Sequence, residues 1–254
     1  MSHHTVEARD LYHTYPDGTA ALRGITFCIT HGESVAIVGE NGAGKSTLLM
    51  HLNGYLAPTG GAVRVGGLPL NRDTLPAVRR AVGMVFQDPD DQLFMPTVFE
   101  DVAFGPLNLG LPPGEVEGRV ARALETVGME GLGNRPPYKL SGGEKRAAAI
   151  ATVLAMEPDI LVMDEPSASL DPRSRRRLIE LLRSFSHTKI IATHDLDMAL
   201  DLCERTLVLH EGLVAADGPT RDILRDESIL GPCSLEKPLR LQGCPICAPP
   251  RATA

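Results

Sequence analysis

Short runs of apolar residues recur along the chain, and most of them end at a turn or at the start of a helical pattern. Four of these runs are Val35–Val38, Ile160–Met163, Ile190–Thr193 and Thr206–Leu209. An unbroken apolar run of roughly four to eight residues is typical of a strand covered on both faces, as in a parallel sheet flanked by helices. The pattern therefore predicts an α/β fold with a parallel-sheet core.

Two other stretches have different patterns. Val6–Ile29 and Ala62–Val65 are more β-like and rich in turns, which predicts an antiparallel β flank. Residues of about 88–156 instead read as a helical insert, because apolar residues recur there at helical spacing after a Pro-Pro pair. These residues are Val116, Val120, Ala123, Leu124 and Val127.

The end of the chain differs again, because prolines interrupt it from Gly231 onward. We expect one domain over residues 1–230 and an extended or poorly ordered tail over residues 231–254. The tail holds a lone C-x-x-C pair, Cys244 and Cys247. Without a second pair or a suitably spaced His, this pair does not complete a tetrahedral zinc site, so an unstructured tail is favoured over a metal sensor.

Composition narrows the function classes. The chain has 254 residues, of which 43% are hydrophobic and 22% charged, as in an ordinary globular domain. Its net charge of −7 gives no reason to expect a nucleic-acid groove. The longest apolar run, Ala147–Met156, is well below the roughly 18 residues of a membrane span, so a membrane role would be peripheral. The odd number of cysteines and the polar first residues favour a reducing cytoplasm.

The clearest motif is a phosphate loop, Gly39-Glu40-Asn41-Gly42-Ala43-Gly44-Lys45-Ser46, followed by Thr47. Its glycines allow backbone N–H groups to surround phosphate oxygens, and the helix that follows adds a favourable dipole. Lys45 would contact the β- and γ-phosphates, and the Ser46 hydroxyl would ligate Mg²⁺. The alternative is an ordinary glycine-rich turn, but the strand before the loop and the helix after it favour the phosphate site.

A second motif follows the apolar run Ile160–Met163, which ends in the adjacent carboxylates Asp164 and Glu165. Ligands of open α/β sheets bind beyond the carboxyl ends of the strands. Asp164 would hold the metal, and Glu165 would orient and deprotonate an attacking water. Taken alone, the same residues also fit a solvated acidic turn.

A third motif, Leu140-Ser141-Gly142-Gly143-Glu144, precedes a helical run. Ser141 and Glu144 have the spacing of a capping box, so the motif fits an ordinary helix start. The two glycines between them disfavour a helix by roughly 1 kcal/mol each relative to Ala. They are explained if a phosphate must approach the backbone at this helix N-terminus.

With these motifs the chain resembles the ABC ATPases over about Val6–Leu224. The three motifs look like Walker A, Walker B and the signature, and Ser169-Leu170-Asp171 looks like the D-loop. The resemblance implies a dimer that sandwiches two ATP molecules with Mg²⁺, each between Walker A of one subunit and the signature of the other. Since all motifs are present, a two-fold homodimer is the economical expectation, with a paralogue heterodimer as the alternative.

The resemblance also implies roles for three single residues. Tyr15 looks like the aromatic residue that stacks on adenine. Gln87 looks like the Q-loop glutamine near the metal and the reacting phosphate, and His194 looks like the histidine that senses the γ-phosphate. A lone His is more often structural, but the position of His194 directly after a sheet strand favours the sensor. Glu144 departs from the family pattern, because Gln is commoner there; its charge would approach the partner's nucleotide unless it caps its own helix.

Finer details resemble the energy-coupling-factor importers, and among them the ATP-binding subunit of the cobalt/nickel systems. The likeness to these importers rests on Tyr15–Thr19, Gln87–Phe94 and Asp101–Pro106. The likeness to the cobalt/nickel subunit rests on Leu140–Arg146, Ile191–Cys203 and Gly243–Cys247. It implies a peripheral position on the cytoplasmic face of the membrane. The implied partners are an energy-coupling transmembrane subunit and a metal-binding membrane component, with no nucleic acid. An importer for another micronutrient such as a vitamin, or a soluble ABC ATPase, is the alternative.

The segment from Asp88 to Phe104 is the predicted docking surface for the membrane subunit. It begins with three acids, Asp88, Asp90 and Asp91, and then offers apolar candidates for contact. These are Leu93, Phe94, Met95, Val98 and Phe99. The alternative is that all of these apolar side chains pack inward.

Overall fold

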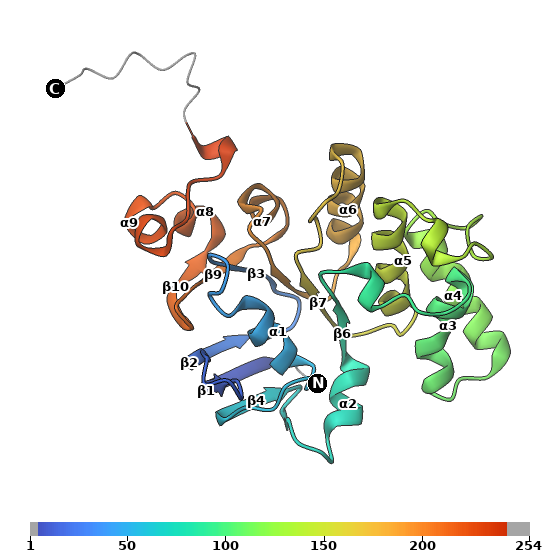
Figure 1. Ribbon diagram of the computed structural model, residues 1–254, viewed down its shortest axis with the longest axis horizontal. Helices are drawn as coiled ribbons and strands as arrows, with labels where there is room; N and C mark the ends of the chain where they lie inside the picture. Colours follow the sequence, from blue (N-terminus) through green and yellow to red (C-terminus); the bar gives the residue numbers. More distant parts are fainter. Residues whose placement is uncertain (1–4, 243–254) are drawn as a thin grey trace.

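The computed structural model describes residues 5–242 and contains two sheets with a separate group of helices (Figure 1). The smaller sheet is antiparallel and has the strand order β2-β1-β4-β5. Its strands are β1 (Val6–Thr14), β2 (Ala20–Ile29), β4 (Gly60–Val65) and β5 (Leu68–Pro69). The predicted antiparallel flank is confirmed.

The larger sheet has the strand order β10-β9-β3-β8-β7-β6. Its strands are β3 (Ser34–Val38), β6 (Val82–Val85), β7 (Ile160–Asp164), β8 (Thr188–Ala192), β9 (Arg205–His210) and β10 (Leu213–Pro219). All pairs are parallel except the β9–β10 hairpin, and every residue of β3, β7 and β8 is buried. The four apolar runs are therefore the parallel core that their pattern predicts.

Two apolar cores cover the faces of this sheet. Val35 and Ile37 of β3 face a core shared with the smaller sheet and α1 (Lys45–Leu52), whereas Ala36 and Val38 face a second core. The second core includes α6 (Pro172–Ser184) and α7 (Leu196–Leu202). This alternation follows from the two-residue period of a strand. Shorter helices complete this part: α2 (Leu75–Ala81), α8 (Thr220–Ile223) and α9 (Glu227–Leu230).

The helical group contains α3 (Val98–Asn108), α4 (Pro113–Thr126) and α5 (Gly142–Leu154), which share their own apolar core. Val116, Val120 and Leu124 of α4 are buried in this core, as their helical spacing requires. The group lies beside the larger sheet, at the β6 end (Figure 1). Within residues 5–242, no helix has both the length and the apolar character of a membrane span.

Two of the apolar residues expected to be exposed in the docking surface are instead part of this core. Leu93 is 8% exposed and Val98 is fully buried. Phe94 and Phe99 remain exposed, at 61% and 37%. Asp101 of α3 fixes the backbone of this turn, because its Oδ1 accepts from the backbone N–H groups of Phe94 at 3.0 Å and Met95 at 2.9 Å.

Residues 231–242, which we expected to be poorly ordered, pack against the domain. They form two short 3₁₀ helices, η3 (Gly231–Cys233) and η4 (Leu239–Leu241). Cys233 is 3% exposed, and Leu235 and Leu241 pack against the core that includes α7. Proline at the first turn of a helix loses no hydrogen bond, so the prolines of this segment do not prevent packing. Cys244 and Cys247 lie outside the described residues.

A buried histidine pair joins β1 to α1. His51 Nδ1 lies 2.7 Å from the carbonyl oxygen of Thr47 and therefore donates to it. His51 Nε2 then accepts from His13 Nδ1 at 3.2 Å, and the same His13 nitrogen lies 3.2 Å from the carbonyl oxygen of Ala57. Burial, and then the nearby His13, lowers the pKa of His51 below its ordinary value.

This pair makes stability pH-dependent. Below the ordinary pKa of about 6.5, the unfolded chain binds a proton that folded His51 refuses, so stability falls as pH decreases from there toward the folded pKa. We expect His51→Gln to show a smaller drop in Tm between pH 7.5 and pH 5.5 than the wild type. The exposed His187→Gln is the control and should keep the full drop. Equal drops in all three proteins would contradict this assignment.

Candidate active site

A cleft of about 740 Å³ opens at the carboxyl ends of the parallel strands β3 and β7. It brings together most of the residues that the motifs single out. These are Tyr15, Gly39, Glu40, Asn41, Gly42, Gly44, Lys45, Ser46, Thr47, Gln87, Asp164, Glu165 and His194. Ala43 belongs to the same loop but is buried beneath it, at 2% exposed.

The phosphate loop connects β3 to α1. Gly42 and Gly44 have φ angles of 85° and 101°, in the left-handed region that glycine adopts without strain. A side chain at Gly39 would clash with the carbonyl oxygen of Leu209. Lys45 folds back over the loop, and its Nζ donates to the carbonyl oxygens of Gly39 at 2.8 Å and Glu40 at 3.0 Å. The loop therefore surrounds a concave site that the Lys45 ammonium group and the N-terminus of α1 both border.

Asp164 ends β7 and is 4% exposed. Burial raises the pKa of its carboxyl group, and a hydrogen bond with Ser46 opposes this rise. Its Oδ1 atom is buried and has no hydrogen-bond partner among the described residues. A carboxylate oxygen with an unused lone pair next to a Ser hydroxyl is the kind of oxygen ligand set that Mg²⁺ prefers. These residues fit the metal that the phosphate loop requires.

Glu165 and His194 follow neighbouring strands and meet in the cleft. Glu165 has a φ of 44°, an unusual left-handed conformation for a residue with a side chain. Its Oε2 lies 2.8 Å from His194 Nδ1 and 3.2 Å from the His194 backbone nitrogen. The Glu165 residue is 6% exposed, whereas the His194 side chain is 67% exposed. A buried carboxylate is thus paired with a histidine that reaches into open space.

Tyr15 lies in the turn after β1, and its hydroxyl is 3.0 Å from Thr47 Oγ1. The His13 ring supports it edge-on, with 4.7 Å between ring centroids. Gln87 lies after β6 and is tied to the helical group, because Arg146 of α5 donates to its carbonyl oxygen at 2.5 Å. The buried Arg146 also donates to the carbonyl oxygen of Phe86 at 2.8 Å. The two ends of the cleft are therefore anchored to different parts of the fold.

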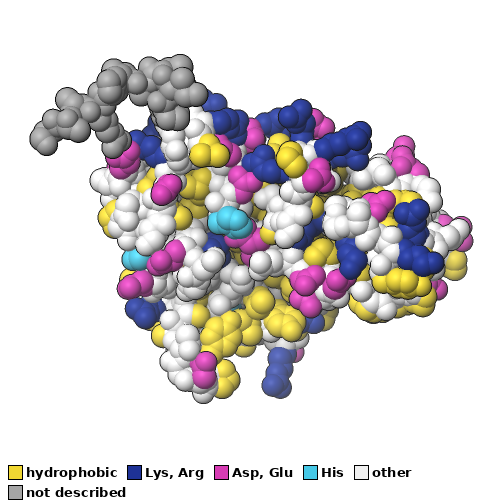
Figure 2. Space-filling model, turned by 45° about the horizontal axis from the view of Figure 1, so that its top comes forward, with side chains coloured by type: hydrophobic (Ala, Val, Ile, Leu, Met, Phe, Trp, Pro, Cys, Tyr) yellow, Lys and Arg dark blue, Asp and Glu magenta, His cyan; other side chains and the backbone are white. Residues whose placement is uncertain are grey.

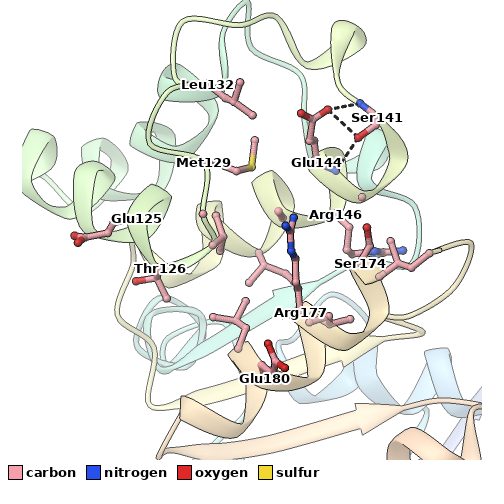
Figure 3. A pocket seen from close by; sticks show the side chains of 18 of the residues that line it. Glu125, Thr126, Met129, Leu132, Ser141, Glu144, Arg146, Ser174, Arg177 and Glu180 are labelled. Atoms are coloured by element: carbon pink, nitrogen blue, oxygen red, sulfur yellow. Dashed lines mark hydrogen bonds between the residues drawn. The ribbon is translucent and has the colours of Figure 1, made fainter. Parts of the chain in front are cut away.

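The signature residues do not line this cleft. Ser141 and Glu144 form the capping box of α5, in which Glu144 Oε2 accepts from the Ser141 backbone N–H at 2.7 Å and from its hydroxyl at 2.8 Å (Figure 3). These hydrogen bonds lower the pKa of Glu144, so its carboxylate is committed to its own helix. The predicted capping box is confirmed, and the space beside Gly142 is open, so the cap leaves room for the phosphate that the other interpretation requires.

Gly143 has a different reason to be glycine. A Cβ there would lie 2.7 Å from the Ser174 hydroxyl of α6, so a side chain would push α5 away from α6. The two helices border a second cavity of about 600 Å³, with Ser141, Glu144 and Ser174 at its edge (Figure 3). The signature therefore lies at a junction of the helical group with the larger sheet's helices.

The cleft also contains residues that the sequence patterns missed. These are Thr19, Ala20, Ala21, Ser234 and Leu235. The first three lie a few residues after Tyr15, so the resemblance of Tyr15 to the aromatic residue that stacks on adenine could have indicated them. Ser234 and Leu235 belong to the segment expected to be unstructured, and no local signal marks them.

Comparison with known proteins places these features in a wider group. The family model described as ABC transporter matches residues 22–168. A putative ABC transporter ATP-binding protein of Geobacter sulfurreducens is 72% identical over 97% of this chain and 99% of its own length. The energy-coupling factor transporter ATP-binding protein EcfA of Methanocaldococcus jannaschii is 49% identical over 92% of this chain and 85% of its own length.

Solved structures are also similar. CbiO1 of Clostridium perfringens, part of the ABC transporter complex cbiONQ, has a TM-score of 0.80 and 39% identity, covering 91% of this chain and 94% of that one. A bacterial ABC transporter cassette solved as a dimer has a TM-score of 0.77 and 30% identity, covering 85% and 99%. The same cassette is also known as a dimer with bound ADP and phosphate.

Proposed function

Because this chain belongs to the ATP-binding proteins of the ABC transporter family, we propose that it is the ATPase of an energy-coupling-factor importer for cobalt or nickel. ABC cassettes bind ATP with Mg²⁺ and hydrolyse it, and the protein is an ATPase of this kind. The observation that carries the residue assignments is the cleft in which Asp164, Glu165 and His194 converge on the phosphate loop.

The geometry of the cleft supports the following binding roles. Tyr15 stacks on the adenine, and the backbone N–H groups of the loop hold the phosphates. Lys45 releases the carbonyl oxygens of its own loop to bind phosphate oxygens. Ser46, Asp164 and Gln87 would hold Mg²⁺, and the bound ion would neutralise charge on the phosphates.

The hydrolytic roles belong to Glu165 and His194. Glu165 accepts a proton from the attacking water at a carboxylate oxygen, which makes the water a better nucleophile. His194 holds that carboxylate through the 2.8 Å contact, and its exposed ring would contact the γ-phosphate of bound ATP. Glu165 follows the fully buried strand β7, so its carboxylate is held in place beside the attacking water.

A second copy of the cassette completes each site. Ser141, Gly142 and Gly143 are outside their own chain's cleft, yet Gly142 has open space beside it for a ligand. The dimeric structure of a related cassette supports this arrangement. We assign the protein to a two-fold homodimer. The test is to purify this chain alone and to measure its mass with ATP. A dimer of this chain supports the homodimer, whereas a chain that dimerises only with a paralogue would support the heterodimer.

An exposed apolar patch on the helical group is the docking surface for the transmembrane subunit. Phe94 and Phe104 are 61% and 43% exposed and stack edge-to-face, with 4.9 Å between ring centroids. Leu107, one turn after Phe104 on α3, extends the patch and is 56% exposed, and Phe99 of the same helix is 37% exposed. Exposed aromatic groups that contact one another mark interaction surfaces, and helices of a membrane subunit would fill this one. The cassette then sits peripherally on the cytoplasmic face of the membrane.

We expect Phe94→Asp to lower co-purification with the transmembrane subunit at least tenfold, because a charge would be buried at the centre of the contact. Binding of ATP by the isolated cassette should stay within about twofold of the wild type. Leu213→Asp is the matched control, since Leu213 is 47% exposed but lies on β10, at the opposite end of the molecule (Figure 1). Normal assembly of the Phe94 variant would place the docking surface elsewhere.

The transported solute is proposed from the likeness to CbiO1 and EcfA. Purification of the protein with its membrane partners, followed by uptake assays with Co²⁺, Ni²⁺ and a panel of vitamins, distinguishes the candidates. ATP-dependent uptake of either metal ion supports the proposal. Uptake of a vitamin alone would replace the metal with another micronutrient while leaving the ATPase assignment intact.

A further inference from the structure

Helix α7, which follows His194, has aspartates that pair with arginines from other segments of the chain. Asp195, the N-cap of α7, receives two hydrogen bonds from Arg175 of α6, at 2.6 and 2.9 Å. At the far end of α7, Asp201 pairs with Arg183 at 2.9 Å. Figure 2 shows Lys and Arg side chains gathered along the upper edge of the molecule, interleaved with Asp and Glu.

A third arginine reaches α7 from the C-terminal segment 231–242, which we term the strap. Arg240 Nε lies 3.1 Å from Asp197 Oδ1, and its Nη2 lies 2.7 Å from the Asp197 carbonyl oxygen and 2.8 Å from Asp201 Oδ2. The backbone N–H of Leu239 adds a bond to Asp197 at 3.1 Å. The planar guanidinium group of Arg240 therefore bridges two aspartates one turn apart on α7, a geometry that a lysine ammonium group would not reproduce.

The other part of the strap reaches the active site. Ser234 and Leu235 line the nucleotide cleft, and the neighbouring Cys233 is buried. Burial and, next, the charge of Glu40 raise the pKa of the Cys233 thiol. The strap thus connects the cleft to α7, and Figure 1 shows the chain after α9 beside α8 and α7.

The position of His194 depends on α7, because few contacts hold its own side chain and Arg175 holds only the adjoining N-cap, Asp195. The ring is 67% exposed, and within residues 5–242 its side chain is held by the contact with Glu165. α7 is one of the shorter helices of the fold, and His194 lies immediately before its N-cap. A small shift of this helix would move the ring away from the carboxylate, and displacements of about 1 Å are large for a reacting site.

We propose that Arg240 is a positioning residue for ATP hydrolysis: through its bonds to Asp197 and Asp201 it holds α7, and with it His194, against Glu165. The strap is then a wall of the nucleotide cleft as well as a brace for the histidine. The inference rests on the proposed role of His194. The binding of phosphates by the phosphate loop does not depend on Arg240.

A double-mutant cycle tests it with the dimeric protein and Mg·ATP. Arg240→Ala should lower kcat by roughly three- to tenfold, with KM within about twofold. In the His194→Ala background the same change should have no further effect, because the residue that it positions is gone. Arg183→Ala is the control: it also removes an arginine from Asp201, but outside the strap, and should leave kcat within about twofold.

Thiol labelling gives a readout independent of turnover. Arg240→Ala should make Cys233 react faster with N-ethylmaleimide, while the exposed Cys28 reacts as in the wild type. A reactive Cys233 with unchanged kcat would overturn the proposal, because the strap would have loosened without consequence. An equal loss of kcat from Arg240→Ala in both backgrounds would also overturn it. Wild-type activity of His194→Ala alone would instead refute the role assigned to the histidine.

Discussion

Glu165→Gln is expected to lower kcat for ATP hydrolysis by a factor of about 10² or more, while ATP still binds. Gln has the same shape and keeps an oxygen that accepts a hydrogen bond, but an amide does not take up the proton of the attacking water. Glu165 is 6% exposed, so bulk solvent does not substitute readily for the missing base. The measurement is kcat of the protein purified with its membrane partners, together with the Kd for ATP.

Glu144→Gln is a matched control for this experiment. It makes the same chemical change at an acid that caps α5 outside its own cleft, and Gln also completes a capping box. We expect this control to hydrolyse ATP within a few fold of the wild type. Near-normal turnover by Glu165→Gln would mean that another group is the base.

Ser141→Arg should have an effect of similar size, at least about 10² on hydrolysis, without loss of ATP binding to the isolated subunit. Ser141 lies outside its own cleft, so the bulky charged side chain blocks only the site that a partner would complete. The decisive measurement mixes this variant with Lys45→Ala, which lacks the ammonium group that binds phosphate. In a mixed dimer both defects fall on one composite site, and the other site is wild type.

Mixing is therefore expected to restore part of the hydrolysis that each variant lacks alone, with a maximum near equal proportions. Subunit exchange should be followed in parallel by affinity capture of one tagged variant, so that mixed dimers are measured directly. Mixed dimers without any recovery of activity would contradict sites shared between subunits. A closed structure with each signature against its own chain's ATP would do the same.

Local sequence was sufficient for the elements whose chemistry is local. The glycines of the phosphate loop were predictable because their spacing encodes a backbone path, and Gly42 and Gly44 adopt the left-handed angles that this path needs. The parallel strands were predictable from unbroken apolar runs such as Ile160–Met163, because only strands covered on both faces tolerate them. The capping box at Ser141 and Glu144 is likewise written in four consecutive residues.

Contacts between distant segments were decided by tertiary structure alone. Glu165 meets His194 because β7 and β8 are neighbours in the sheet, and strand order is not visible in either strand's own sequence. Leu93 points into the helical core and Phe94 away from it, although both are apolar and adjacent. The prolines of the strap predict a loose tail, because they are a local signal. The contacts of Arg240 with Asp197 and Asp201 form only after folding, so the sequence pattern does not reveal them. Motifs are carried by backbone preferences within a few residues, but the support of a catalytic side chain depends on charges and surfaces that the chain brings together from far apart.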